Sequence, residues 1–401
     1  MPFTKVLSDN MPSKNILLFD TDLRGHHADY ISSLIDYQQR NPNYQLTVVT
    51  DERLITVFEK RYSTHANKLT FVGISESEIT NLHQQNIFKR SYNEWQLFCR
   101  FAKEYQATQG LLMYFDVFQI GLLFGSPPPC PVSGIYFRPD FHYKTTDWKS
   151  NLNALRKKWM LRRILDKPFL NTVFSLDKSA VTVIKSISKK TTILPISDPV
   201  RSYEVSVSEV NSLQNELGLN QNKKTLLLFG FLDDRKGIEK VISALELMDS
   251  TDLKQVQLVL VGVIATDYQE KIEHLIRELP DSIIVKTVFE EVKGAKTQQY
   301  FELSDYVLAL YQQHVGMSQI VIRAAISRKP LISSDYGLVG KLVSEKALGI
   351  TVDSANPEEI AKAFTEVLKN GISVNEMSME ALANENSETA FASTIFGKLL
   401  R

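Results

Sequence analysis

Short apolar runs rich in β-branched residues alternate with helix-period segments along the whole chain of 401 residues. Such alternation is typical of parallel sheets, in which each pair of neighbouring strands is joined by a helix that packs on the sheet. Continuous apolar runs also indicate strands that are covered on both sides. The pattern therefore predicts an α/β fold with helices on both faces of its sheets.

The first half contains seven strand candidates, which suffice for one complete doubly wound domain. They span residues 15–20, 45–50, 68–74, 111–116, 132–137, 173–176 and 192–195. After Pro195 the pattern lapses into a polar stretch, and it restarts at Thr225 with the run TLLLFG. We expect the hinge between two domains at residues 197–200.

The second half contains six strand candidates, with helix candidates such as 238–248 and 357–368 between them. The strands span residues 225–230, 257–262, 282–288, 305–310, 330–334 and 349–352. At ~100 to 200 residues per domain, the length also fits two domains. We expect two Rossmann-like domains, residues 1–197 and 198–375, that face each other across a cleft lined by strand ends, followed by a helical tail, 376–401.

The composition argues against several classes of protein. The 46 Lys and Arg balance 46 Asp and Glu, whereas a nucleic-acid binder normally carries a basic excess. The two cysteines, Cys99 and Cys130, lack metal-ligand spacing and favour a reducing, cytoplasmic compartment without structural zinc. The polar N-terminus lacks the apolar run of a signal peptide, and no apolar run reaches the ~20 residues of a membrane-spanning helix.

The first strand leads into the segment RGHHADY, in which Arg24, Gly25, His26 and His27 precede an apolar helical stripe. Free N–H groups at a helix start attract anions, and Gly25 would allow close approach by a phosphate or a sugar. The alternative is that the glycine only makes a tight turn and that the histidines are solvated.

The second domain opens with a strand, a glycine-containing loop with Arg235 and Lys236, and a helix. Two cations beside a helix start suit a diphosphate; alternatively, they pair with Asp233 and Asp234. Further along, Gly316, Met317 and Ser318 precede a helix that carries the cation Arg323, and together they indicate a second open helix start.

These segments resemble a known family. The succession LLFGFLDDRKG, LVLVG, FEE, SDYVLALY, GMSQIVIRAAISRKPLISSDYG and LGITVD is similar to the C-terminal donor-binding domain of retaining GT-B glycosyltransferases, especially family 4. The resemblance covers about 130 residues of the second domain. The RGHHADY segment is similar to the glycine-rich, often histidine-containing loop after the first strand of those enzymes.

The resemblance implies that the second domain binds a nucleotide diphosphate sugar, and that the sugar passes with retention to an acceptor on the first domain. No metal or cofactor is implied, because protein cations and helix starts neutralise the diphosphate. By position, Lys236 matches the lysine at the diphosphate, Gly316, Met317 and Ser318 match the loop beneath the sugar, and Phe289 and Glu290 fall where the base is held.

The sequence also departs from the family. Phe231 stands where an arginine is common, and Val315 and Arg323 stand where the family has two glutamates. Arg323 could face a diphosphate or an acidic sugar, and Arg235 could replace the missing cation. Two hypotheses follow: an active transferase with an altered site, or a catalytically silent protein that binds a nucleotide or glycan or partners an active transferase.

On the acceptor side we expect groups at the ends of first-domain strands. Asp116 ends one apolar strand candidate, and Arg138, Asp140 and His142 follow another. A carboxylate or an imidazole there could orient or deprotonate a hydroxyl. We therefore select Asp116 and His26 as catalytic candidates and His27, Arg138 and His142 as acceptor-side candidates, although a strand-end aspartate often only caps a helix.

Although the net charge of the chain is zero, residues 148–167 form a strongly basic stretch. Its seven Lys and Arg are opposed only by Asp166 and are interleaved with apolar residues. A basic amphipathic helix suits an anionic membrane surface and thus a lipid-linked acceptor. The alternative is a surface helix whose apolar stripe packs on its own sheet.

Overall fold

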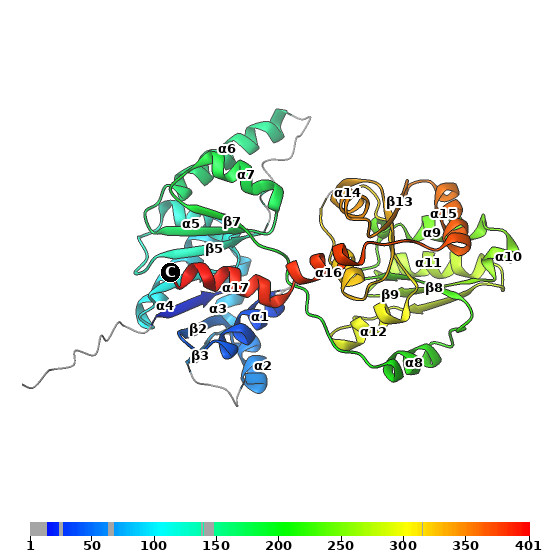
Figure 1. Cartoon of the computed structure of the whole chain (residues 1–401). Helices are drawn as coiled ribbons and strands as arrows, with labels where there is room; N and C mark the ends of the chain where they lie inside the picture. Colours follow the sequence, from blue (N-terminus) through cyan, green and yellow to red (C-terminus); the bar gives the residue numbers. More distant parts are fainter. Residues whose placement is uncertain (1–13, 24–26, 63–67, 138, 140–147, 315) are drawn as a thin grey trace, which may run out of the picture. The chain divides into compact units, whose positions relative to one another are not determined.

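The computed structural model describes residues 14–23, 27–62, 68–137, 139, 148–314 and 316–401 (Figure 1). The chain divides into two compact units. The first extends to Pro199 and also includes Glu388–Arg401, and the second is Val200–Ser387. Each unit is built around one parallel sheet, so the predicted α/β class with two Rossmann-like sheets is confirmed.

The first unit contains a seven-stranded sheet in the order β3-β2-β1-β4-β5-β6-β7. Every neighbouring pair of these strands is parallel. The strands are β1 (Asn15–Phe19), β2 (Gln45–Asp51), β3 (Leu69–Ile74), β4 (Gln109–Leu112), β5 (Val132–Tyr136), β6 (Leu170–Ser175) and β7 (Thr192–Pro195).

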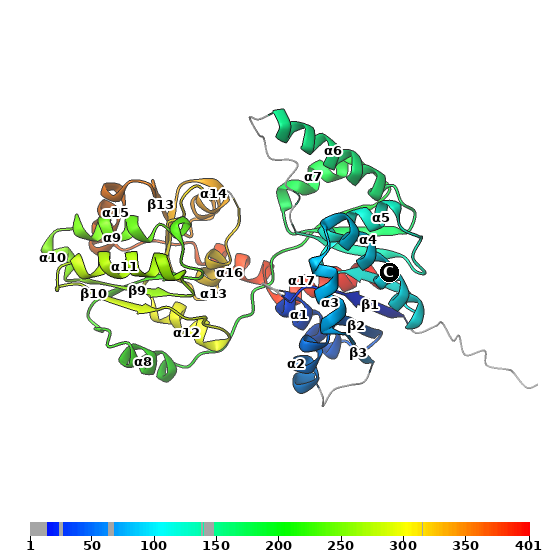
Figure 2. The same cartoon turned by 180° about the vertical axis from the view of Figure 1, so that it is seen from behind.

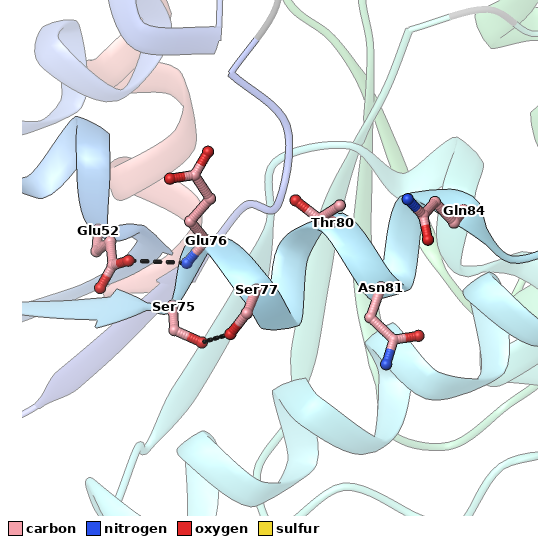
Figure 3. Close-up of a pocket in the computed structure, with 7 residues that line it drawn as sticks. All are labelled: Glu52, Ser75, Glu76, Ser77, Thr80, Asn81 and Gln84. Carbon is pink, nitrogen blue, oxygen red and sulfur yellow. Dashed lines mark hydrogen bonds between the residues drawn. The ribbon is translucent and has the colours of Figure 1, made fainter.

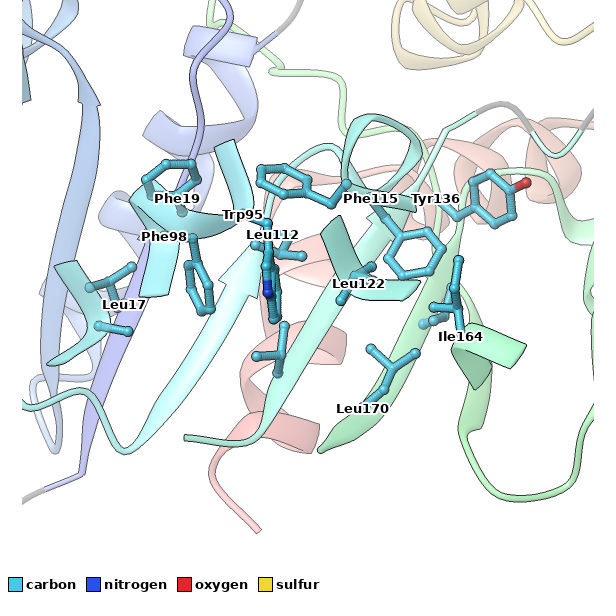
Figure 4. Packing of buried hydrophobic residues seen from close by; sticks show 14 of the residues in the cluster. Leu17, Phe19, Trp95, Phe98, Leu112, Phe115, Leu122, Tyr136, Ile164 and Leu170 are labelled. Carbon is cyan, nitrogen blue, oxygen red and sulfur yellow. The ribbon is translucent and has the colours of Figure 1, made fainter. Parts of the chain in front are cut away.

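Both faces of this sheet are covered, because successive side chains of a strand point to opposite faces. Ile16 and Leu18 of β1 pack in one cluster with residues of α1, α2 and α17, while Leu17 and Phe19 pack in another with residues of α4, α5 and α6 (Figure 4). The helices are α1 (His27–Arg40), α2 (Glu52–Tyr62), α3 (Glu76–Gln84), α4 (Ile87–Glu104), α5 (Gln119–Phe124), α6 (Trp148–Leu165), α7 (Lys178–Ile187) and α17 (Glu388–Leu399).

The second unit contains a six-stranded parallel sheet in the order β10-β9-β8-β11-β12-β13 (Figure 2). Its strands are β8 (Lys224–Phe229), β9 (Val256–Val261), β10 (Ile284–Val288), β11 (Tyr306–Ala309), β12 (Leu331–Ser334) and β13 (Gly349–Val352). Its helices are α8 (Val207–Glu216), α9 (Ile238–Glu246), α10 (Ser250–Leu253), α11 (Thr266–Glu278), α12 (Ala295–Leu303), α13 (Gln319–Ile326), α14 (Gly337–Glu345), α15 (Pro357–Asn370) and α16 (Glu376–Glu385).

The end of the chain is shared between the two units. Helix α16 packs on α13 in the second unit, whereas α17 packs on α1 in the first. Phe396 of α17 is buried, and its ring lies 5.7 Å from the ring of Tyr37 and 4.9 Å from that of Tyr44. The first unit therefore uses the last helix of the chain as part of its own core.

The fourth strand is shorter at its carboxyl end than expected, and Asp116 does not end it. Strand β4 ends at Leu112, and Asp116 lies in the 3-10 turn Phe115–Phe118. Met113 still donates its N–H to the carbonyl of Phe19 at 3.0 Å. Beyond it the chain turns, and the carboxylate of Asp116 accepts the N–H of Phe137 at 2.9 Å.

The packing of α17 generates a prediction about stability. Phe396→Ala should destabilise the first unit by about 3 to 5 kcal/mol, because it removes a fully buried aromatic ring. Gly397→Ala is the matched control, since a Cβ there would meet no atom within 4 Å and alanine favours a helix by up to about 1 kcal/mol. Urea unfolding followed by circular dichroism measures both; equal stabilities of the two variants would contradict this role of α17.

Candidate functional site

The strand orders place one switch point in each sheet. In the first unit the order reverses between β1 and β4, and in the second between β8 and β11. Loops that leave neighbouring strands in opposite directions open a crevice at the carboxyl ends of such strands, where ligands bind in this type of sheet. The loops that follow these strands are therefore the candidate sites.

Lys236 lies at the switch point of the second unit. Its Nζ donates to the carbonyl of Phe229, at the end of β8, at 2.8 Å and lies 3.0 Å from the hydroxyl of Tyr311, after β11. Nζ is also 4.8 Å from the centre of the Tyr311 ring. The ammonium group thus joins the two strands at which the order reverses.

The helix start of α13 belongs to the same cluster. The Tyr311 hydroxyl lies 2.6 Å from Oγ of Ser318, and this Oγ accepts the N–H of Ile320 at 3.2 Å as the N-cap of the helix. Lys236, Tyr311, Ser318 and the positive end of α13 are therefore connected by hydrogen bonds. A cation beside a helix N-terminus is an arrangement that favours a phosphate.

Two glycines with positive φ angles determine the backbone conformation of the loop after β8. Gly230 has φ +112°, and a Cβ there would lie 3.0 Å from Nζ of Lys236. Gly237, at the start of α9, has φ +70°, and a Cβ there would lie 2.4 Å from the carbonyl oxygen of Leu310. Any other residue at Gly237 would push α9 away from β11 and displace Lys236.

The two neighbouring cations of this loop differ in their partners. Arg235 is exposed, and its Nε and Nη2 donate to the carboxylate of Asp233 at 2.9 and 2.7 Å. Lys236 forms no ion pair with any residue that the structure describes. The alternative of pairing with nearby acids thus applies to Arg235 and not to Lys236.

The other predicted donor-side residues surround this cluster. Phe289 and Glu290 follow β10, with Phe289 half-buried and Glu290 exposed. Met317 is half-buried, and its carbonyl lies 3.3 Å from Nε2 of His314. Gly316 precedes Met317, and Arg323 lies on the same face of α13 as Gln319. Tyr311 and Gln312 were not selected from the sequence.

A cavity of about 380 Å³ adjoins the cluster, at the carboxyl ends of β8, β11, β12 and β13. Gln312 connects its walls, because its N–H donates to the carbonyl of Arg235 at 2.8 Å and its side-chain amide donates to the carbonyl of Ser354 at 2.7 Å. The lining residues are Asp234, Arg235, Gln312, Gln313, Asp335, Tyr336, Asp353, Ser354 and Ala355.

In the first unit, His27 and Asp20 meet at the switch point between β1 and β4. Asp20 follows β1 and is 2% exposed, and its Oδ2 lies 2.6 Å from Nδ1 of His27, the first residue of α1. Oδ1 of the same carboxylate accepts the N–H of Asp22 at 3.0 Å. The sequence did not single out Asp20, which it indicated only as the last residue of a strand.

Aromatic rings hold the imidazole of His27 in place. The Phe137 ring stacks on it at 5.9 Å between centres, and the Tyr114 ring meets it edge-on at 5.4 Å. Asp116 accepts the backbone N–H of Phe137. The structure thus brings His27 and Asp116 into one cluster. Gly25, His26, Arg138 and His142, as well as Val315 in the second unit, lie outside the described residues.

A buried carboxyl group binds Thr21, the residue next to Asp20. Glu94 of α4 is fully buried, and its Oε1 accepts the hydroxyl of Thr21 at 2.7 Å and Nε of Arg90 at 2.8 Å. Burial raises the pKa of Glu94, although the charge of Arg90 opposes this shift. The carboxyl group therefore holds its proton to higher pH than an exposed glutamate does.

An open polar hollow lies at the same edge of the first sheet, after β2 and β3 (Figure 3). The carboxylate of Glu52 accepts the N–H of Glu76 there at 2.8 Å, and the hydroxyls of Ser75 and Ser77 lie 3.2 Å apart. The lining residues are Glu52, Ser75, Glu76, Ser77, Thr80, Asn81 and Gln84, and none of them is among the predicted site residues.

The described residues contain no group of three or more His, Cys, Asp or Glu side chains that could hold a metal ion. Cys99 and Cys130 are free thiols, and burial raises their pKa values to about 12 and about 11. In the part of the chain that the structure describes, no helix combines the length and the apolar character needed to cross a bilayer.

Comparison with protein families identifies the second unit. Residues 210–383 match the family described as glycosyl transferases group 1. The C-terminal half of the chain is therefore a group 1 glycosyltransferase domain, as the sequence resemblance indicated. The enzymes of this family are glycosyltransferases that depend on nucleotide sugars. No curated protein matches the chain by sequence.

Solved structures match nearly the whole chain. A glycosyltransferase from Rickettsia africae aligns with a TM-score of 0.70 at 12% identity, covering 97% of this chain and 99% of that one. HepE from Anabaena, solved in complex with UDP, aligns with a TM-score of 0.66 at 15% identity over 97% and 99%. Sucrose-phosphate synthase from Thermosynechococcus elongatus gives 0.65 at 15% over 97% and 98%. The predicted GT-B fold is confirmed.

The buried carboxyl group generates a prediction about pH. Because the folded-state pKa of Glu94 is raised, the wild-type protein should lose stability as pH rises above the ordinary pKa of glutamate, about 4.3. Glu94→Gln keeps the shape of the neutral form and has no proton to lose. The stability of this variant relative to wild type should therefore increase with pH.

Unfolding by urea between about pH 4 and pH 8 measures this trend. Glu209→Gln is a control of opposite sign, because hydrogen bonds from Ser206 lower the pKa of Glu209 and the variant should become relatively less stable as pH rises. A difference between Glu94→Gln and wild type that stays constant with pH would contradict the prediction.

Proposed function

We propose that this chain, whose residues 210–383 are a group 1 glycosyltransferase domain, transfers a sugar with retention from a nucleotide diphosphate sugar to an acceptor held by the first unit. The observation that carries the proposal is the cluster of Lys236, Tyr311, Ser318 and the start of α13 at the switch point of this domain. The proposed reaction does not depend on a metal ion, because Lys236 and the helix start stabilise the departing diphosphate.

The chemistry of the cluster supports a diphosphate as its ligand. Lys236 lies against a hydroxyl and a carbonyl and not against a carboxylate of the described residues, so its charge stays available for an anion. A phosphate oxygen bound by this ammonium and by N–H groups at the start of α13 would receive charge-assisted hydrogen bonds. HepE, which shares the fold, was solved with UDP and with UDP-glucose, and these are the first ligands to test.

Arg235 provides a second cation for the proposed site. Its guanidinium group is more than half exposed and is held by Asp233. Exposed ion pairs contribute only about 0 to 1 kcal/mol, so a diphosphate can compete with Asp233 for this arginine. We propose that Arg235 compensates for the arginine missing at Phe231, and that Arg323 faces the diphosphate or an acidic group of the sugar.

The alternative is a catalytically silent binder or partner of an active transferase. The observation that favours it is the departure from the family pattern at Phe231 and Arg323. Phe231 is 55% exposed, so it provides a ring for stacking but no charge for a leaving group. Turnover distinguishes the two functions: an enzyme releases nucleotide from its donor with acceptors from cell extract, whereas a binder is stabilised by the nucleotide without releasing it.

A thermal-shift panel with UDP, GDP and ADP tests the donor site. The nucleotide that fits should stabilise the wild-type protein, and Lys236→Met should abolish the shift, because a charge-assisted hydrogen bond of about 1.5 to 3 kcal/mol is lost. Lys341→Met is the matched control: this lysine lies in the same unit, is exposed, and is 3.8 Å from Glu345. Absence of a shift with all three nucleotides would overturn the donor site, and an unchanged shift in Lys236→Met would overturn the role of this lysine.

Helix α6 supports a membrane-proximal acceptor. Its buried stripe, Leu161, Ile164 and Leu165, packs in the core of the first unit. At 100° per residue, Leu155 and Trp159 lie on the opposite side of the helix, and they are 63% and 54% exposed. Packing on its own sheet therefore accounts for only one of the two apolar stripes of α6.

The charges around the exposed stripe suit an anionic surface. Arg163 lies with its guanidinium carbon 5.4 Å from the centre of the Trp159 ring, and α6 contains five further cations and no acid. An exposed tryptophan among arginines and lysines is a combination that binds at the interface of anionic bilayers. We propose that α6 brings the first unit to such a surface and that the acceptor is a glycan or a lipid-linked molecule.

Vesicle flotation tests this contact. The wild-type protein should float with vesicles of phosphatidylglycerol and phosphatidylcholine at low salt, and the double variant Leu155→Ser, Trp159→Ser should bind at least tenfold more weakly, since each buried large apolar side chain contributes about 1.5 to 3 kcal/mol. Val57→Ser, which removes an exposed apolar residue from α2, is the control. Failure of the wild-type protein to float would remove the membrane proposal and leave a water-soluble acceptor.

A further inference from the structure

The cavity at the carboxyl ends of β8, β11, β12 and β13 can hold a small molecule of its own. Its volume of about 380 Å³ lies within the usual range of small-ligand sites, ~300 to 1,000 Å³. Lys236, Tyr311 and Ser318, which form the hydrogen-bonded cluster at the switch point, do not line it. The cavity is therefore a separate space from the cluster proposed to hold the diphosphate, although Arg235 borders both.

Carboxylates dominate the charge around this cavity. Asp234, Asp335 and Asp353 come from three different loops, after β8, β12 and β13, and Arg235 is the only cation among the lining residues. The charge of Arg235 is already balanced by Asp233. A cleft lined by one sign of charge concentrates ligands of the opposite sign. The lining thus favours a positively charged ligand and disfavours a phosphate.

The same carboxylates keep hydrogen-bonding capacity for a ligand. The side chain of Asp335 makes no hydrogen bond or ion pair with any residue that the structure describes. Asp353 uses one oxygen to accept the N–H of Ala355 at 2.9 Å, and Asp234 uses one to accept the N–H of Arg235 at 2.9 Å. The second oxygen of each can still accept. These acceptors suit a ligand that is rich in hydroxyl and ammonium donors.

The three carboxylates are spread around the cavity. Asp234, Asp335 and Asp353 are all described by the structure, and they do not form a group that could hold a metal ion. A calcium ion, for comparison, gathers about six to eight oxygens at about 2.3 to 2.6 Å. A ligand that reaches several of these carboxylates at once is therefore an extended organic molecule.

Uncharged groups complete the lining and suit a sugar. The side chain of Tyr336 is 51% exposed, so its ring offers a flat apolar face. The amide nitrogen of Gln312 donates to the carbonyls of Leu310 and Ser354 at 3.0 and 2.7 Å, which leaves its oxygen as an acceptor. Small-molecule sites combine such an apolar surface with a few polar groups that fix orientation. A tyrosine ring also attracts a cation above its face.

We propose that this cavity binds a cationic sugar, an amino sugar whose ammonium group pairs with Asp335 and whose ring lies on Tyr336. The hydroxyl groups of the sugar donate to the remaining oxygens of Asp234 and Asp353. This binding is a property of the second unit alone and does not require transferase activity. The alternative is a solvated hollow whose exposed side chains bind water.

Titrations of the full chain with three sugars test the role of the charge. The dissociation constants of glucosamine, glucose and N-acetylglucosamine are measured by calorimetry at about pH 6, where the amine is protonated and the aspartates are ionised. Glucosamine should bind about tenfold more tightly than glucose or better, because it adds a hydrogen bond between charged groups. N-acetylglucosamine, which has no charge, should bind like glucose. Equal dissociation constants for glucosamine and glucose would overturn the proposal.

Two variants test the residues. Asp335→Asn keeps the shape of the side chain and removes its charge, so it should weaken glucosamine about tenfold and leave glucose unchanged. Tyr336→Ser should weaken both sugars, because both lie on the ring. Asp281→Asn is the matched control, since Asp281 is an exposed aspartate of the same unit outside the lining. Asp335 and Tyr336 are exposed, so both variants should keep the wild-type Tm, which separates lost binding from lost folding.

Spermidine, a cation without a sugar ring, is the last probe. Spermidine that binds more tightly than glucosamine, with a dissociation constant unchanged by Tyr336→Ser, would show a general attraction of cations and would overturn the sugar site. An unchanged dissociation constant of glucosamine in Asp335→Asn would overturn it as well. Failure of glucosamine to bind the wild-type protein would also overturn the site, and it would leave the nucleotide shift, and with it the proposed transferase function, untouched.

Discussion

Parallel pairing of the strands is the constraint on which the rest of this structure depends. Each strand must be followed by a crossover to the other end of the sheet, and helices that cover both faces provide it. The side chains of the strands are consequently buried and pack in the hydrophobic core, as Leu17 and Leu18 of β1 illustrate. Polar groups able to do chemistry remain at the carboxyl edge, and the reversal of strand order selects one place along that edge.

The two units use this constraint in chemically different ways. The second unit places a cation, a phenol and a helix start at its switch point, in a cluster that favours negative charge. The first unit places an imidazole against a buried carboxylate and beside aromatic rings. The same sheet topology thus carries different side chains at its two switch points, and the difference lies in a few loop residues.

Much of the fold could be predicted from the sequence, because strands buried on both faces are continuous apolar runs. Strand β9, for example, is visible as QLVLVG.

The sites were harder to predict. Lys236 is recognisable beside Arg235 and a glycine, whereas Tyr311 is only an aromatic residue after an apolar strand, and its contact with Lys236 depends on the pairing of β8 with β11. Asp20 was hidden at the end of a strand, and Asp116 was misplaced because the apolar run continues beyond the last hydrogen bond of β4. The apolar pattern of α17 predicts a helix, but it does not indicate which of the two sheets this helix covers.

Helix α17 follows the second unit in the sequence but packs in the first. The first unit can therefore be completed only after the second has been synthesised. The chain enters the second unit at Val200 and leaves it at Ser387, so this unit is a continuous insertion within the first. During synthesis from the N-terminus, the second unit has its whole sequence available while the first still lacks the helix that supplies Phe391 and Phe396 to its core. The first unit begins earlier and is finished last, and it keeps an uncovered apolar face throughout the synthesis of its neighbour.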